Sequence, residues 1–146
     1  MSTATLGQVE LAQDVGDVRI LLAMDNVAAR LTMEALLRKS GYAVDSAASL
    51  PEAMEKVEGE KYALVLCDLR GESPEACRRV IKLAQTQEYR PATGYLTASP
   101  EEYKPQKSDQ LLIETVDVPS LLTQVADLIA GRAADRSRRA VHRHWA

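Results

Sequence analysis

The stretch ALVLCDLR, Ala63–Arg70, is a nearly continuous apolar run that ends at an aspartate. A short run without polar alternation is typical of a strand buried on both faces, as in a parallel sheet covered by helices. Asp68 ends the run, so the strand would present a carboxylate at its carboxyl end. Ligands of open parallel sheets bind at that edge, and the sequence therefore predicts a site there.

The rest of the chain alternates apolar runs with helical stripes. The run Val18–Met24 has the same buried character and stops at Asp25, whereas YAVDSA at 42–47 is more polar, which favours an edge strand. Helical spacing of apolar residues follows every run except the fourth. A serine shortly before a proline, as at Ser49–Pro51 and Ser73–Pro74, predicts a capped helix start. Strands are predicted at 18–24, 42–47, 62–67, 92–98 and 110–115, and helices near 29–40, 50–57, 76–84 and from about 120.

Five strands that alternate with helices predict a parallel sheet with both faces covered, because parallel strands require right-handed crossovers. The residues that end the predicted strands are then expected at one edge: Asp25, Asp68, Thr97 and Glu114. The pattern fails between the last two strands. The segment 99–109, SPEEYKPQKSD, has two prolines and almost no apolar stripe, so the helix there is expected to be short or irregular.

Composition limits the size and the class of the protein. A chain of 146 residues with 46% hydrophobic residues can bury one core comfortably, so one domain is expected. Residues 131–146 hold five arginines and one aspartate, a balance of +4, which leaves -7 on the rest of a chain whose net charge is -3. Cys67 and Cys77 lie in predicted core elements, so a disulfide framework is not expected. No apolar segment indicates secretion or a membrane span, and we expect a cytoplasmic protein.

From about residue 17 to residue 131 the chain resembles a response-regulator receiver domain, the phosphoacceptor module of two-component signalling. The resemblance rests on ILLAMDN, LVLCDLR, YLTAS and LIETVDVPSLL, which occur in order at predicted strand ends. It implies an α/β, flavodoxin-like doubly wound five-stranded parallel sheet in the order 2-1-3-4-5. The residue pattern adds a short or irregular fourth helix and an extended last helix. It divides the chain into a flexible N-terminal segment (1–16), the receiver domain (17–131) and a basic C-terminal extension (132–146), helical at its start.

The resemblance also implies a set of site residues. Asp68 matches the aspartate that receives a phosphoryl group from a histidine kinase. Asp25, Asp68 and the main-chain carbonyl of Arg70 match the ligands of Mg²⁺, an ion that needs only one or two carboxylates besides waters and phosphate oxygens. Thr97 matches the hydroxyl that hydrogen-bonds the phosphoryl group and carries the switch.

Three positions depart from the family pattern. Met24 replaces the first acid of the pair, which should weaken the hold on Mg²⁺. Glu114 replaces the lysine that pairs with the phosphorylated aspartate, which turns a Coulomb attraction into a repulsion of roughly 1–4 kcal/mol. We expect Glu114 to point away, to be protonated or to help bind a cation. Leu111 stands where the family often carries an aromatic residue of the output surface.

These site residues are compatible with two functions. The first is a stand-alone receiver protein in a phosphorelay, phosphorylated at Asp68 with Mg²⁺ by a sensor histidine kinase or a phosphotransfer protein, with a downstream protein partner. The second is a degenerate pseudo-receiver that acts as a phosphorylation-independent interaction module. In neither case is an independent enzyme expected, beyond phosphoryl transfer to its own Asp68 and its self-dephosphorylation. A hydrolase is disfavoured because Arg70 stands where a second acid would be needed.

The basic extension carries a regular arginine pattern. Four arginines follow the helical spacing i, i+4, i+7 and i+11: Arg132, Arg136, Arg139 and Arg143. One interpretation is a solvated helix end whose cations suit the C-terminal dipole. The other is a docking element for an acidic partner or for a second copy in a homodimer. Direct nucleic-acid binding is not expected, because no recognition helix or aromatic pattern accompanies the charge.

Overall fold

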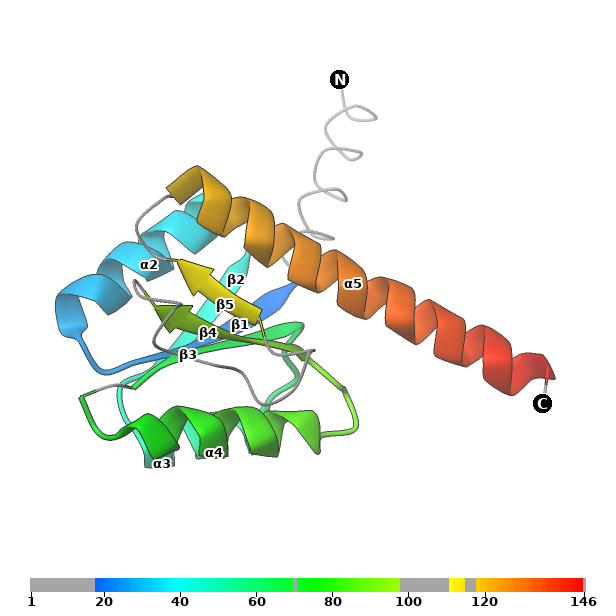
Figure 1. Ribbon diagram of the computed structural model, residues 1–146, viewed down its shortest axis with the longest axis horizontal. Helices are drawn as coiled ribbons and strands as arrows, with labels where there is room; N and C mark the ends of the chain where they lie inside the picture. Colours follow the sequence, from blue (N-terminus) through cyan, green and yellow to red (C-terminus); the bar gives the residue numbers. More distant parts are fainter. Residues whose placement is uncertain (1–17, 70, 98–110, 115–117, 146) are drawn as a thin grey trace, which may run out of the picture.

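The computed structural model describes residues 18–69, 71–97, 111–114 and 118–145, with the backbone alone at Pro74, Thr97, 111–114 and 135–145. The N-terminal segment 1–16 and the segment 99–109, for which we predicted an irregular helix, lie outside this range. The elements are β1 (Arg19–Met24), α2 (Val27–Lys39), β2 (Ala43–Ala47), α3 (Leu50–Gly59), β3 (Leu64–Asp68), α4 (Pro74–Gln85), β4 (Ala92–Thr97), β5 (Leu111–Glu114) and α5 (Val118–Trp145) (Figure 1).

The strands form one parallel sheet in the order β2-β1-β3-β4-β5. The polar strand β2 lies at the edge, as its sequence predicts, and β3 lies at the centre with every residue buried. The alternation of strands and helices and the order of the first four strands confirm the fold class expected from the sequence. The sheet therefore gathers the carboxyl ends of its strands at one edge.

Capping side chains define where three of the helices begin, and a glycine follows the end of α2. The side chains of Asn26, Ser49 and Ser73 accept the backbone N–H three residues ahead, which caps α2, α3 and α4. Gly41 follows the end of α2 with φ of 101°, a conformation that favours glycine. These caps fix each helix start directly after a strand end or its loop.

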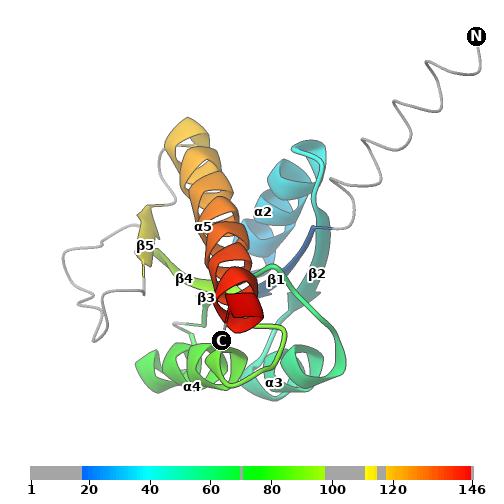
Figure 2. The same cartoon turned by 90° about the vertical axis from the view of Figure 1, so that its right-hand side faces the viewer.

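One hydrophobic cluster lies on each face of the sheet. Helices α3 and α4 cover one face and α2 and α5 the other, as Figure 2 shows. Alternate residues of β3 enter different clusters: Val65 and Cys67 face α3 and α4, and Leu64 and Leu66 face α2 and α5. Each face therefore buries its own set of side chains, and β3 contributes to both.

The last helix is longer than the sheet requires. Leu121, Val125 and Leu128 bury one stripe of its first half against the sheet. Its 28 residues correspond to about 42 Å, and the second half extends beyond the end of the sheet (Figure 1). The helix starts at Val118, two residues earlier than predicted, because Pro119 is tolerated in a first turn, where its missing N–H would have no helical partner. The predicted boundary at residue 131 lies inside a continuous helix.

Candidate functional site

The register of the sheet brings the predicted site positions to one edge. Met24 and Asp68 are directly paired across β1 and β3, so Asp25 follows at the neighbouring strand end. Thr97 is paired with Glu114 across β4 and β5. These strands are consecutive in the sheet, which places all five positions along its carboxyl edge. The sequence-based prediction of a shared edge is confirmed.

Asp68 is the most unusual of these residues because it is a buried acid. Its exposure is only 9%, and it ends a strand whose other residues are fully apolar in character. Burying a carboxylate is costly unless it has polar or cationic partners. Its place at the carboxyl edge of a parallel sheet, where such sheets bind ligands, makes Asp68 a candidate functional residue.

Asp25 is held by the loop that follows β3. Its Oδ2 accepts a hydrogen bond from the Glu72 N–H at 3.0 Å. The loop approaches so closely that a Cβ on Gly71 would lie 2.6 Å from the same oxygen. Glycine at position 71 therefore allows a contact that any side chain would disturb.

Glu72 links this loop to the start of α3. Its carboxylate oxygens accept the Leu50 N–H at 3.1 and 3.2 Å. Leu50 opens α3, where backbone N–H groups lack helical partners and the helix dipole favours an anion. Glu72 thus accepts the Leu50 N–H at the start of α3 with its side chain, and it orients Asp25 with its own backbone N–H.

A cation also lies at this edge. The Arg30 guanidinium donates to the backbone carbonyl of Met24 at 3.0 Å, next to the Met24–Asp68 pair. Met24 itself is 2% exposed and packs in the core against α2 and α5, so a buried hydrophobic residue stands where the resemblance predicts an acid. Positive charge is therefore supplied close to the end of β1.

Sequence reasoning missed Arg30, Gly71 and Glu72. Arg30 carried one signal, because a cation near a helix N-terminus opposes the helix dipole and so indicates another partner. The roles of Gly71 and Glu72 arise from contacts with residues far away in sequence, 47 positions for the Glu72–Asp25 bond. No local pattern encodes such a contact.

The donor set at this edge fits the demands of Mg²⁺ in part. Asp25 and Asp68 supply two carboxylates, which is sufficient for an ion that keeps several waters. The Arg70 carbonyl lies outside the described residues. Within the described part of the chain, no three His, Cys, Asp or Glu side chains are grouped as a metal site. The set is therefore a minimal one that relies on the two aspartates.

The remaining predicted residues are placed only in part. Leu111 and Glu114 are described as backbone in β5, and Thr97 as backbone at the end of β4. The guanidinium of Arg132 donates to the carbonyls of Arg90 and Tyr89, both at 3.1 Å. Arg90 has a φ of 45°, so this contact supports a strained turn before β4. Arg132 therefore secures α5 to the α4–β4 loop.

The further docking arginines are known in position only. Positions 136, 139 and 143 lie in α5, beyond the part of the helix that packs on the sheet. Their side chains are outside the described set.

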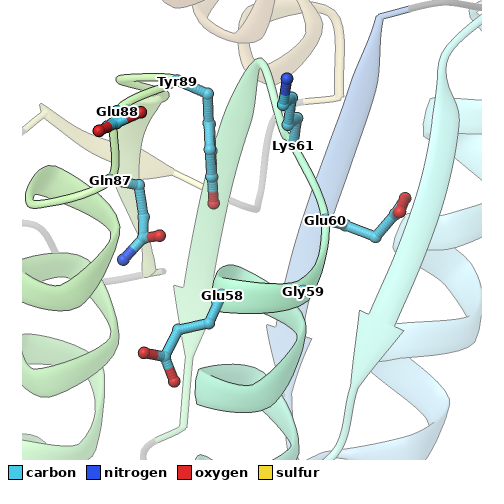
Figure 3. Close-up of a pocket in the computed structure, with 7 residues that line it drawn as sticks. All are labelled: Glu58, Gly59, Glu60, Lys61, Gln87, Glu88 and Tyr89. Atoms are coloured by element: carbon cyan, nitrogen blue, oxygen red, sulfur yellow. The ribbon is translucent and has the colours of Figure 1, made fainter.

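A hollow lies at the amino ends of the strands, opposite Asp68, and its charged side chains do not converge as those of the candidate site do. It measures about 520 Å³ and is lined by Glu58, Gly59, Glu60, Lys61, Gln87, Glu88 and Tyr89. Its residues precede β3 and β4, so it faces away from Asp68. Figure 3 shows the side chains of Glu58 and Glu60 pointing away from each other, and Glu60 ion-pairs with Arg19 at 3.9 Å. These carboxylates do not converge on a common ligand position.

No helix in the described part of the chain is long and apolar enough to cross a membrane.

Comparison with known proteins gives matches to solved structures. No protein-family model matches the chain, and no curated protein matches it. A response regulator receiver protein from Sinorhizobium medicae is similar with 26% identity and a TM-score of 0.68, over 79% of this chain and 96% of that one. The chemotaxis response regulator CheY4 of Vibrio cholerae is similar with 21% identity and a TM-score of 0.64, over 76% and 98%.

A third similar structure contains a ligand. The response regulator TrrA from Thermotoga maritima, in complex with Mg²⁺-BeF, matches with 23% identity and a TM-score of 0.64, over 76% of this chain and 98% of that one. The three matches cover nearly the whole of the other chains.

Proposed function

Because the chain has the receiver-domain fold of response regulators, we propose that it acts in two-component or phosphorelay signalling with Asp68 as its phosphoacceptor. The observation that carries this proposal is a buried carboxylate at the end of the central strand with Asp25 at the neighbouring strand end. This edge is where open parallel sheets bind ligands.

The chemistry assigned to Asp68 is a single displacement. A carboxylate oxygen of Asp68 attacks the phosphorus of a phosphohistidine or small phosphodonor, and an O–P bond forms as the donor's bond to phosphorus breaks. Asp25, Asp68 and the Arg70 carbonyl would hold Mg²⁺, which neutralises phosphoryl charge when bound. The Glu72 N–H orients Asp25 for this task through its bond to Oδ2. Thr97 is proposed to hydrogen-bond the phosphoryl group.

Two charged residues near Asp68 act on the phosphoryl group in opposite directions. Glu114, paired in register with Thr97, adds a negative charge where the family has a lysine. Arg30 adds a positive charge at the other side of the site, beside Met24. We propose that Arg30 offsets part of the repulsion and that Glu114 keeps the acyl phosphate short-lived.

Exposed apolar side chains beside the site support a protein phosphodonor. Val27 and Leu31 are 58% and 56% exposed on the first turns of α2, directly after Asp25, and Val118 at the start of α5 is 37% exposed. A hollow of about 430 Å³ is lined by Leu31 and by residues further along α2, as far as Lys39. We propose this surface as the docking face for a sensor histidine kinase or phosphotransfer protein.

A second function, a pseudo-receiver that binds a partner without phosphorylation, is favoured by two observations. Met24 is a core residue in place of an acid, and one oxygen of Asp25 is already bonded to the Glu72 amide. Both reduce the ligands left for Mg²⁺. Signalling would then depend on the apolar surface and the C-terminal extension alone.

One experiment separates the two functions. The full chain is incubated with acetyl phosphate, with and without Mg²⁺, and its intact mass is compared with that of Asp68→Asn. Phosphoacceptor function requires a Mg²⁺-dependent gain of one phosphoryl group that the variant lacks. An unchanged mass, with no effect of Mg²⁺ on the melting temperature, would support the pseudo-receiver.

A further inference from the structure

The outer side of α2 carries an apolar hollow of about 430 Å³. Leu31 in this hollow is 56% exposed, whereas the inner side of the same helix buries Met33 and Leu37 in the core. A surface helix normally turns a polar face outward, so apolar surface on the outer side indicates a contact with another segment or molecule. The residues that line the hollow all belong to α2 and follow helical spacing: Leu31, Thr32, Ala35, Leu36 and Lys39.

The segment 1–17 joins the sheet beside this helix. The carbonyl of Val18, the first described residue, accepts the Ala43 N–H at 3.0 Å. Ala43 begins β2 shortly after α2 ends at Lys39, so the segment leaves the sheet near the last turn of α2. The hollow extends over residues 31–39, about 12 Å of helix, and an extended segment of this length reaches about 55 Å. The segment is therefore long enough to cover the hollow.

The segment also suits the hollow in polarity and in charge. Its large aliphatic residues are Leu6, Val9, Leu11 and Val15. It has no lysine or arginine, and its charged side chains are Glu10, Asp14 and Asp17. The last turn of α2 presents the opposite charge, because Arg38 and Lys39 are exposed there. The one acid of α2, Glu34, is 8% exposed and pairs with Arg38 at 3.7 Å.

We propose that the segment 1–17 folds back on its own α2 and covers this hollow. Its aliphatic residues would pack against Leu31 and Leu36, and its acids would lie toward Lys39. Attachment to β1 gives the segment a high effective concentration at the hollow, which favours it over a free partner. The contact goes beyond the proposed signalling function and does not depend on it. Because Leu31 also belongs to the docking face proposed above, the segment would compete with a protein phosphodonor, and that consequence alone rests on the proposed function.

A photo-crosslinker placed in the hollow tests the contact directly. In the full chain p-benzoylphenylalanine replaces Ala35, which is exposed and lines the hollow. After irradiation and digestion with trypsin, the expected partner is the peptide Met1–Arg19, which contains the whole segment. The crosslinked protein should keep the mass of one chain. The matched control has the crosslinker at Arg79, which is exposed on α4 at the other face of the sheet (Figure 2), and it should not capture that peptide.

A mutant cycle tests whether the contact stabilises the chain. Leu31→Ser is introduced into the wild type and into a chain with four serine substitutions in the segment: Leu6→Ser, Val9→Ser, Leu11→Ser and Val15→Ser. It should lower the urea midpoint by roughly 0.3–1 M more in the wild type, because only there is Leu31 covered by aliphatic side chains. Val27→Ser is the matched control, because Val27 is 58% exposed on the same helix but does not line the hollow. Its effect should be equal in both backgrounds.

Two results would overturn the proposal. One is a crosslinker at position 35 that captures Met1–Arg19 no more often than the control does, or that joins two chains and so assigns the hollow to a second copy. The other is a Leu31→Ser substitution that shifts the urea midpoint equally in the two backgrounds.

Discussion

Replacing Gly71 by alanine tests the contact between the loop and Asp25. The new Cβ would lie 2.6 Å from Oδ2 and 3.0 Å from Cγ of Asp25, which is too close for either group to stay. The obstacle is the end of a short side chain, so Asp25 can rotate away and the backbone need not move. The cost is then the hydrogen bond from the Glu72 N–H, about 0.5–1.5 kcal/mol for a partly exposed pair.

The effect of Gly71→Ala on the free energy of unfolding depends on whether Asp25 is present. Alanine at a backbone conformation it can adopt stabilises by about 0.4–1 kcal/mol through the unfolded chain. In the wild type this gain and the lost hydrogen bond should nearly cancel. In Asp25→Ala, where no carboxylate remains to be displaced, the same substitution should stabilise, which gives a coupling of about 1 kcal/mol between positions 25 and 71.

Urea denaturation of the wild type, both single variants and the double variant measures this coupling. At typical slopes it corresponds to a midpoint difference of roughly 0.3–1 M. Gly131→Ala is the matched control, because nothing lies within 4 Å of a Cβ there and its effect should be equal in both backgrounds. Equal effects of Gly71→Ala in the two backgrounds, within about 0.3 kcal/mol, would refute the contact.

Three other perturbations have defined outcomes. Glu114→Lys should lengthen the lifetime of the acyl phosphate several-fold, measured by intact mass after the donor is removed; no change would contradict the electrostatic argument. Arg132→Gln should destabilise the chain by about 1–2 kcal/mol in urea by removing two bonds to the α4–β4 loop, and a cost equal to that of Arg136→Gln would count against this role. Burial raises the pKa of Tyr89 to about 12, so the folded chain keeps a proton that the unfolded chain releases near pH 10. Stability should therefore fall from about pH 10 to 12, and this fall should be shallower in Tyr89→Phe; an unchanged pH profile would oppose the assignment.

The sequence predicted the sheet well because its signals are local. The apolar runs of β1 and β3, the polar edge strand β2 and the capping serines depend on residues that are neighbours in the chain. The strand ends at Asp25, Asp68, Thr97 and Glu114 followed directly from those runs. The edge could therefore be predicted before any contact was known.

The arrangement within the site could not be predicted in the same way. The contact of Gly71 and Glu72 with Asp25 depends on how a loop folds back over a distant strand end. The hydrogen bond from the Leu69 N–H to the Cys77 Sγ depends on the position of α4 over β3. Arg132, assigned by its spacing to a docking stripe, contacts a loop 42 residues away through Arg90. In each case the determining partner is outside the local pattern.

The central claim is that Asp68 accepts a phosphoryl group, and its most direct test locates that group. The full chain is treated with acetyl phosphate and Mg²⁺, then reduced with borohydride, which converts an aspartyl phosphate to homoserine. The tryptic peptide Tyr62–Arg70, which contains Asp68 as its only acid, is analysed by mass spectrometry. The proposal predicts homoserine at position 68, dependent on Mg²⁺. Homoserine at position 25 in the tryptic peptide Ile20–Arg30, or no homoserine in either peptide, would contradict it.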